Sequence, residues 1–288
     1  MTGGYLRHFI ACNNFDIKQF SPFFINGKRY GFVRSEVAEF LSSSLPTDFS
    51  LRDSALYLSD NLSGFDARSE ALLSATKALA ARRGKELRHE MYPVVEEMTD
   101  APLAQVDRIA VPWFGVRAWG VHVNGFVRKK DGIHMWIGKR ASDRPAEPGK
   151  LDHIIGGGQP IGLTPEQNLC KEAKEEAGIE EGIALTAKKV GELRYSLQRE
   201  DGVRNDTILM YDLELPDGFM PTNTDGEVES FSLMPISEVA VLVKDTNEFK
   251  LNCNMVITDF LVRYGAISPE CSEYAEIKKW LCRNSRCV

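Results

Sequence analysis

Three glutamates near the end of a predicted helix are the side chains of this chain best placed to do chemistry. Glu172, Glu175 and Glu176 are spaced i, i+3 and i+4, so they share one helical face within an arc of about 100°. Carboxylates in the last turns oppose the helix macrodipole and repel one another. Divalent cations would relieve this repulsion, and hard oxygen ligands suit Mg²⁺ or Mn²⁺. The alternative is a solvated acidic face that Lys171 and Lys174 offset.

A glycine-rich turn and a well-marked helix must position these carboxylates. Thr164 is a suitable N-cap, Pro165 fits the first helical position, and Gln167 can complete a capping box. Gly178 stands where a helix is expected to stop. The pattern therefore predicts a helix of about 13 residues, or roughly 20 Å, that starts just after the glycines.

Composition excludes several classes of function. The chain has 288 residues, 43% of them hydrophobic and 26% charged, as is ordinary for a globular protein of one large or two modest domains. A net charge of -6 and a pI near 5.5 argue against a nucleic-acid partner held by broad electrostatics. No apolar run approaches the roughly 18–20 residues of a membrane span, and the first residues lack a long apolar segment typical of a secretory signal. We therefore expect a cytoplasmic protein without a membrane partner.

The six cysteines show no sequence signature of a disulfide framework or a zinc site. They stand at positions 12, 170, 253, 271, 282 and 287, without a CxxC pair and without a Cys/His cluster of zinc-binding spacing. We expect all six to be reduced thiols, and Cys170 to pack beside the glutamate helix as a small hydrophobe.

Residues 1–105 are predicted to form a separate, smaller α+β domain. Two apolar runs around Asn26-Gly27 predict a β-hairpin over 23–33. A strand is predicted over 51–58, and helices over 5–15, 35–41 and 68–83, the last ended by Gly84. This part carries no catalytic pattern, and His89 and Glu90 are interpreted as surface residues.

Residues 106–288 are predicted to form a second domain in which strands alternate with helices. A strand over 113–128 is expected to turn or bulge at Gly120 and at Asn124-Gly125. Further strands are predicted over 133–139, 151–155, 187–198, 205–215 and 228–234. Helices are predicted over 237–243, 253–264 and 273–281.

The glutamate helix and its glycine turn resemble a Nudix box, whose pattern is G-x5-E-x7-R-E-U-x-E-E-x-G-U with U aliphatic. The run Lys171-Glu172-Ala173-Lys174-Glu175-Glu176-Ala177-Gly178-Ile179 matches its right end, with Lys in place of Arg. Gly157 matches the leading glycine, whereas Leu163 replaces the first glutamate. The resemblance implies an α/β fold: a Nudix α/β/α sandwich with a mixed sheet, preceded by the smaller α+β domain.

The resemblance also implies a Mg²⁺- or Mn²⁺-dependent pyrophosphohydrolase. Glu172, Glu175 and Glu176 would hold one to three metal ions, with the carbonyl of Gly157 as a further ligand. Lys171 would orient a box glutamate through a charged hydrogen bond, although Lys lacks the planar fork of Arg.

Three residues outside the box are candidate contacts to substrate or water. Either a box glutamate or one of Glu227 and Glu229 would serve as the base; a pair of plain surface acids is the alternative for the latter two. Arg140 is a candidate phosphate contact or a generic exposed arginine. His153 is expected to be packed or exposed rather than catalytic.

Four further stretches resemble the thiamin-pyrophosphokinase-related Nudix subgroup: 135–140, 151–158, 211–216 and 225–231. This implies a small-molecule substrate such as thiamin diphosphate, or a damaged or oxidised form, cleaved to the monophosphate. Trp113, Trp119 or Trp136 would stack on such a ring, unless they belong to the core. The alternatives are a catalytically weak Nudix-fold sensor or scaffold, or an isomerase or transferase on the same fold. A homodimer is the other partner we expect.

Overall fold

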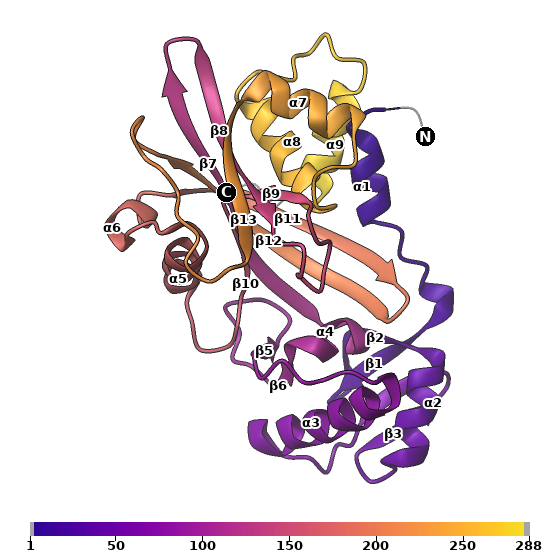
Figure 1. Cartoon of the computed structure of the whole chain (residues 1–288). Coiled ribbons are helices and arrows are strands. Elements are labelled where there is room, and N and C mark those ends of the chain that lie inside the picture. Colours follow the sequence, from indigo (N-terminus) through magenta and orange to yellow (C-terminus); the bar gives the residue numbers. More distant parts are fainter. Residues whose placement is uncertain (1–2, 285–288) are drawn as a thin grey trace.

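The computed structural model describes residues 3–284 and contains two units joined side by side (Figure 1). The N-terminal unit holds a four-stranded sheet of order β2-β1-β4-β3. Its strands are β1 (Phe20–Ile25), β2 (Lys28–Arg34), β3 (Phe49–Arg52) and β4 (Ala55–Leu58). Helices α2 (Ser35–Ser44) and α3 (Gly64–Arg83) pack on this sheet through a shared hydrophobic core.

Local turn chemistry decides where these first strands begin and end. Asn26 and Gly27 both have positive φ, 50° and 72°, which confirms the predicted hairpin. The predicted single strand over 51–58 is wrong. Asp53 and Ser54, at φ 49° and 60°, form a left-handed turn that splits this stretch into β3 and β4. Gly84, at φ 60°, ends α3 as predicted.

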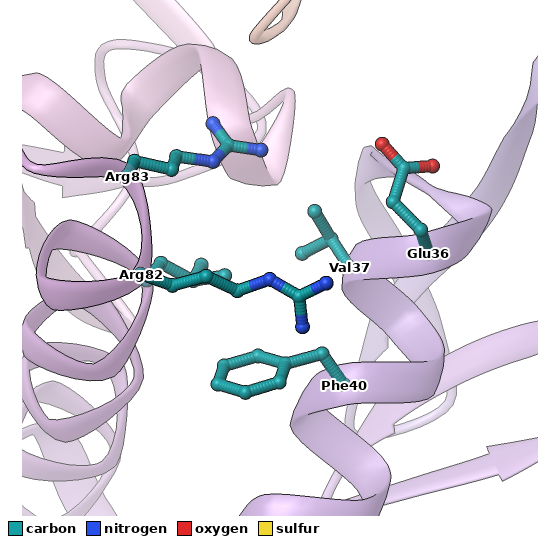
Figure 2. Close-up of a pocket in the computed structure, with 6 residues that line it drawn as sticks. Glu36, Val37, Phe40, Arg82 and Arg83 are labelled. Carbon is teal, nitrogen blue, oxygen red and sulfur yellow. The ribbon is translucent and has the colours of Figure 1, made fainter.

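The side chains of α2 and α3 leave a cavity of about 160 Å³ between the two helices (Figure 2). The Arg82 side chain extends from α3 across this space, and its guanidinium lies 4.8 Å from the ring centre of Phe40 on α2. At this cavity the two helices are therefore held together partly by a cation–π interaction between side chains that line it.

A seven-stranded mixed sheet forms the centre of the C-terminal unit. Its main order is β11-β12-β7-β8-β13, with β10 paired to β7 and β9 paired to β8. The pair β12·β7 is parallel, and the other pairs are antiparallel. The strands are β7 (Arg117–Lys129), β8 (Gly132–Arg140), β9 (Leu151–His153), β10 (Ile155–Gly158), β11 (Lys188–Arg199), β12 (Gly202–Glu214) and β13 (Val228–Pro235).

Helices cover both faces of this sheet, as the α/β/α sandwich requires (Figure 1). One face packs against α5 (Pro165–Ala177) and α6 (Glu181–Ala184). The other face packs against α7 (Ile236–Asp245), α8 (Cys253–Arg263), α9 (Tyr274–Asn284) and α1 (Leu6–Cys12). Although α1 begins the chain, Tyr5 and Phe9 are buried in the core of this second unit.

A short two-stranded sheet connects the two units. It consists of β5 (Met91–Val94) and β6 (Ala104–Asp107), neither of which the sequence pattern predicted. The remaining short elements are two 3₁₀ helices, Ile17–Gln19 and Arg108–Ala110, and α4 (Val111–Phe114). Because α4 occupies the start of the predicted strand over 113–128, β7 begins only at Arg117.

The predicted turns at Gly120 and Asn124-Gly125 are wrong, since β7 runs through both positions. Glycine is needed at these positions instead because a side chain would not fit. A Cβ on Gly120 would lie 2.9 Å from the carbonyl oxygen of Gly157, and one on Gly125 would lie 2.6 Å from a methyl carbon of Ile154.

The tryptophans considered for a stacking pocket are core residues. Trp113 belongs to the N-terminal core, whereas Trp119 and Trp136 lie in the core beneath α5. None is more than 4% exposed, so the predicted aromatic pocket is wrong for these three residues. Among the described residues, no helix has both the length and the apolar character that a membrane crossing would need.

Candidate functional site

The glutamate helix α5 has the bounds and caps that its sequence predicted. Thr164 N donates to Gln167 Oε1 at 2.9 Å, and Gln167 N donates to Thr164 Oγ1 at 3.2 Å, which completes the capping box. Gly178 ends the helix in the left-handed region at φ 63°.

The loop after β12 satisfies backbone carbonyls at the C-terminal end of α5. Thr222 N donates to Ala177 O at 2.9 Å, and Thr224 N donates to Glu175 O at 3.1 Å. The Thr224 hydroxyl donates to the same Glu175 carbonyl at 2.7 Å. These bonds stabilise the helix end that carries the repelling carboxylates.

The three glycines of β10 form a surface without side chains on which the site is built. Gly156 N donates to Glu176 Oε2 at 2.7 Å. A Cβ on Gly157 would lie 2.5 Å from Glu172 Oε2, so this carboxylate rests directly on the glycine. A Cβ on Gly158 would overlap the hydroxyl of Tyr92, which comes from β5.

The three box carboxylates differ in exposure. Glu176 is 7% exposed and the Glu172 side chain 12%, whereas the Glu175 side chain is 46% exposed. Burial, together with the nearby Glu172 charge, raises the pKa of Glu176 to about 8. Burial also raises the pKa of Glu172. The cations and hydrogen-bond donors near Glu172 and Glu176 are therefore too few to offset the cost of burying two negative charges on one helix face.

Lys171 bridges two of the box glutamates. Its Nζ lies 3.0 Å from Glu172 Oε1 and 2.9 Å from Glu175 Oε2. This places the lysine at the edge of the carboxylate group and leaves Glu176 without a cationic partner among the ion pairs of the described residues.

Arg140 holds a loop and a buried aspartate. Its Nη1 donates to Asp152 Oδ2 at 2.9 Å, and its Nη2 and Nε donate to the carbonyls of Ala146 and Glu147 at 2.9 and 3.2 Å. These contacts commit the planar fork of the guanidinium to the chain that connects β8 and β9.

The two downstream glutamates occupy different environments. Glu227 pairs with Arg144 and lines a small cavity together with Asp152, His153 and Glu176. Glu229 lies where a bulge shifts the register of β13, and it pairs with the exposed Lys139 at 2.9 Å. Of these two glutamates, Glu227 is the one that shares a cavity with a box carboxylate, Glu176.

The N-terminal unit contacts the site directly, which the sequence did not reveal. Ile161 N donates to Met91 O at 2.9 Å, and Tyr92 packs on Gly158. Arg108 Nη1 pairs with Glu90 Oε2 at 2.6 Å, and the arginine charge acts on Glu172 to lower its pKa against the larger effect of burial. The signal missing from the sequence was the pairing of β5 with β6, because both strands are only four residues long.

Histidine and cysteine placement agrees in part with expectation. His153 is packed, with 3% of its surface exposed. Cys170 lies half-buried against the core beneath α5. The five described cysteines are free thiols, as predicted, and Cys287 lies outside the described residues. The spacing argument against a Cys/His cluster, however, does not hold in space, because His122, His153 and Cys253 come together with Asp152.

Two family descriptions match adjoining parts of the chain. Residues 4–118 match "Domain of unknown function (DUF4743)", and residues 118–253 match "NUDIX domain".

Relatives extend the likeness over nearly the whole sequence. Over 298 residues the chain is 36% identical to Nudix hydrolase 20, chloroplastic, from Arabidopsis thaliana, covering 99% of this chain and 79% of that protein. Over 289 residues it is 36% identical to Nudix hydrolase 24, chloroplastic, from the same plant, again covering 99% and 79%. The solved structure of DR0079 from Deinococcus radiodurans is 21% identical, with a TM-score of 0.40, covering 58% of this chain and 97% of that one.

Proposed function

Because this chain belongs to the Nudix hydrolase family and is a hydrolase of pyrophosphate bonds, we propose that its box glutamates bind Mg²⁺ or Mn²⁺ and that its substrate is a small organic diphosphate. In this proposal the enzyme releases the monophosphate. Thiamin diphosphate and its oxidised forms are the first candidates, on the basis of the four stretches beyond the box.

The observation that carries the metal proposal is the environment of Glu176. This residue is 7% exposed, and its carboxylate accepts a hydrogen bond from Gly156 N. A buried carboxylate is costly unless a cation or several donors compensate it. Glu172 lies beside it on the same helix face, and Glu175 completes the set toward solvent. These residues suit a hard dication, which prefers oxygen ligands.

The described residues divide the work of the site. Glu172, Glu175, Glu176 and the carbonyl of Gly157 would hold the metal, which when bound neutralises charge on the phosphate oxygens and makes water a better nucleophile. Lys171 keeps Glu172 and Glu175 in place through its two ion pairs.

Glu227 accepts a proton from the attacking water in this proposal, because it shares the small cavity with Glu176. The water oxygen forms a new bond to phosphorus while the bridging P–O bond breaks. The bridging oxygen leaves with the departing phosphate, which takes up a proton from solvent. Arg144, paired with Glu227, holds this glutamate at the cavity.

A substrate panel with matched variants tests this function. Purified enzyme is incubated with Mg²⁺ and a set of nucleoside diphosphate derivatives, dinucleoside polyphosphates and thiamin diphosphate analogues, and the products are identified by ³¹P NMR. We expect release of a monophosphate from at least one small diphosphate. Glu176→Gln should lower kcat by at least about 100-fold, because an electrostatic contribution to the transition state is lost. Glu166→Gln, an exposed glutamate at the opposite end of α5, is the control and should keep full activity.

Three outcomes would refute parts of the proposal. Full activity of Glu176→Gln would remove this residue from the metal set. Tight binding of a diphosphate without turnover across the panel would favour a sensor or scaffold. Isomerised or transferred products without pyrophosphate cleavage would favour a different reaction on the same fold.

A further inference from the structure

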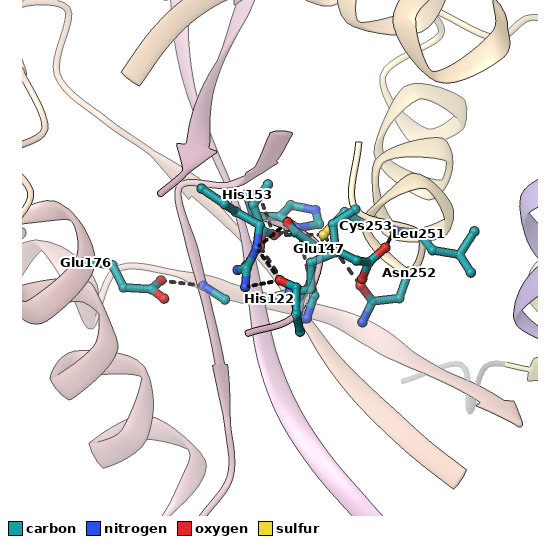
Figure 3. Close-up of polar contacts among 12 residues, drawn as sticks. His122, Glu147, His153, Glu176, Leu251, Asn252 and Cys253 are labelled. Carbon is teal, nitrogen blue, oxygen red and sulfur yellow. Dashed lines mark hydrogen bonds and ion pairs between the residues drawn. The ribbon is translucent and has the colours of Figure 1, made fainter. Parts of the chain in front are cut away.

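Four buried side chains with metal-ligating atoms converge between the sheet and α8. They are His122 on β7, Asp152 and His153 on β9, and Cys253 at the first position of α8. All four are buried, and one ligand atom from each lies within 4.8 Å of the others. Figure 3 shows the histidines and Cys253 gathered on one side of the strands, with Glu176 reaching the glycine strand from α5 on the other.

The separations of the ligand atoms lie within several tenths of an ångström of those in a coordination shell. His122 Nδ1 lies 3.1 Å from His153 Nδ1 and 3.9 Å from Cys253 Sγ. Asp152 Oδ1 lies 2.8 Å from Cys253 Sγ and 3.7 Å from His153 Nδ1. Ligands at the usual zinc distances on a tetrahedron stand about 3.3–3.6 Å apart. Small side-chain rotations would therefore bring these four atoms onto one ion.

The surroundings of Asp152 orient it toward this centre. Its Oδ2 accepts from Arg140 Nη1 at 2.9 Å and from Lys250 Nζ at 3.0 Å. Its Oδ1 accepts from the backbone N of His153 at 2.9 Å and faces Cys253. Because Arg140 and Lys250 hold Oδ2, Oδ1 is left facing the other three side chains, where it could bind a metal. Residues behind metal ligands commonly orient the ligands in this way.

Two cations balance the charge of the Asp152 carboxylate. Arg140 Nη1 lies 2.9 Å and Lys250 Nζ 3.0 Å from Asp152 Oδ2, whereas Cys253 Sγ donates a hydrogen bond to Asp152 Oδ1. Because the thiolate is the form of cysteine that binds metal, an ion that enters the site must displace the proton that Cys253 donates to Asp152.

We propose that His122, Asp152, His153 and Cys253 form a binding site for a zinc-like transition-metal ion, separate from the Mg²⁺ site of the box. Two imidazole nitrogens and a thiolate suit Zn²⁺ or Co²⁺ and disfavour Mg²⁺, which prefers six oxygens. The ion would tie β7, β9 and α8 together directly behind the glycine strand. Because Asp152 and His153 share a cavity wall with Glu176, it would also stiffen the support of the box.

Cobalt spectroscopy tests the site without reading turnover. The full chain, freed of metal, is titrated with Co²⁺ while the near-ultraviolet sulfur-to-cobalt band and the visible bands are recorded. We expect a strong sulfur-to-cobalt band whose intensity saturates at one Co²⁺ per chain in the presence of excess Mg²⁺, and which Zn²⁺ abolishes. Cys253→Ser should lose the band, and Cys170→Ser, which removes a half-buried thiol elsewhere, should keep it.

The opposite results would overturn the site. The absence of a sulfur-to-cobalt band in the wild type at saturating Co²⁺ would do so even if Cys253→Ser fails to fold. Persistence of the band in Cys253→Ser, or its loss in Cys170→Ser, would place the ion elsewhere. Because hydrolysis is not measured, the hydrolase proposal and this one fail independently.

Discussion

Replacing Gly158 with alanine should disturb the contact between the N-terminal unit and the glycine strand β10. The added Cβ would overlap the Tyr92 hydroxyl and would lie 2.9 Å from Tyr92 Cζ. Tyr92 is 5% exposed, and its ring belongs to the N-terminal core, so the ring cannot swing into solvent. The clash must therefore be relieved by moving β5 or β10.

The size of this effect follows from the cost of overpacking. Forcing one extra carbon into a packed interior costs about 1–3 kcal/mol, which for a chain of this size lowers the melting temperature by about 2–6 °C. The hydroxyl is the nearest atom, so Tyr92→Phe in the same chain should return part of that loss, with a coupling energy of about 0.5–3 kcal/mol.

Thermal unfolding of the four members of this cycle, with turnover recorded alongside, provides the measurement. Gly182→Ala is the matched control, since a Cβ there meets no atom within 4 Å, and it should be neutral or slightly stabilising. Wild-type stability and activity of Gly158→Ala would refute the packing of Tyr92 on β10. A cycle without coupling would show that the clash involves another group.

Three further predictions concern charge. In metal-free protein held in EDTA, burial raises the pKa of Glu176 to about 8 in the folded state, against 4.5 for an unperturbed glutamate. The wild type is therefore most stable below pH 4.5 as far as this group is concerned, and it loses stability as pH rises through 8, because the buried carboxyl resists an ionisation that the unfolded chain undergoes freely. Glu176→Gln should therefore gain up to about 5 kcal/mol of stability over the wild type at pH 9 and little at pH 4, and equal pH profiles would contradict the assignment. Burial lowers the pKa of His8 from 6.5 to about 4, so stability present above pH 6.5 should fall by up to about 3 kcal/mol as pH drops to 4; His8→Gln should flatten this slope in urea titrations. Arg140→Ala should cost about 1–3 kcal/mol of unfolding free energy through lost bonds to Asp152 and the loop, whereas a raised KM at unchanged stability would identify a phosphate contact instead.

The parts of the fold that the sequence predicts are those decided by neighbouring residues. The bounds of α5 follow from Thr164, Gln167 and Gly178, because capping acts within one turn of the helix. The hairpin at Asn26-Gly27 follows from two adjacent residues that accept positive φ. The mixed sheet follows from the family resemblance, which the matching relatives support.

Features that depend on distant segments could not be predicted. Tyr92 reaches Gly158 only because two four-residue strands pair between the units. His122 and Cys253 are far apart in sequence, so they show no metal-ligand spacing, although in space both belong to one cluster with Asp152 and His153. The sequence around Arg140 likewise does not indicate that its guanidinium forms an ion pair with the buried Asp152. In each case tertiary packing, rather than local propensity, sets the partner.

Metal binding by the box carboxylates is the central claim, and titration of metal-free protein with Mn²⁺ tests it most directly. Electron paramagnetic resonance reports the free ion, and Mn²⁺, a hard cation, favours the carboxylates over the His/Cys cluster. We predict that the wild type and Glu166→Gln bind Mn²⁺ alike, and that the pair Glu172→Gln with Glu176→Gln loses most of this binding while keeping its fold by circular dichroism. Unchanged Mn²⁺ binding in the folded double variant would contradict the account.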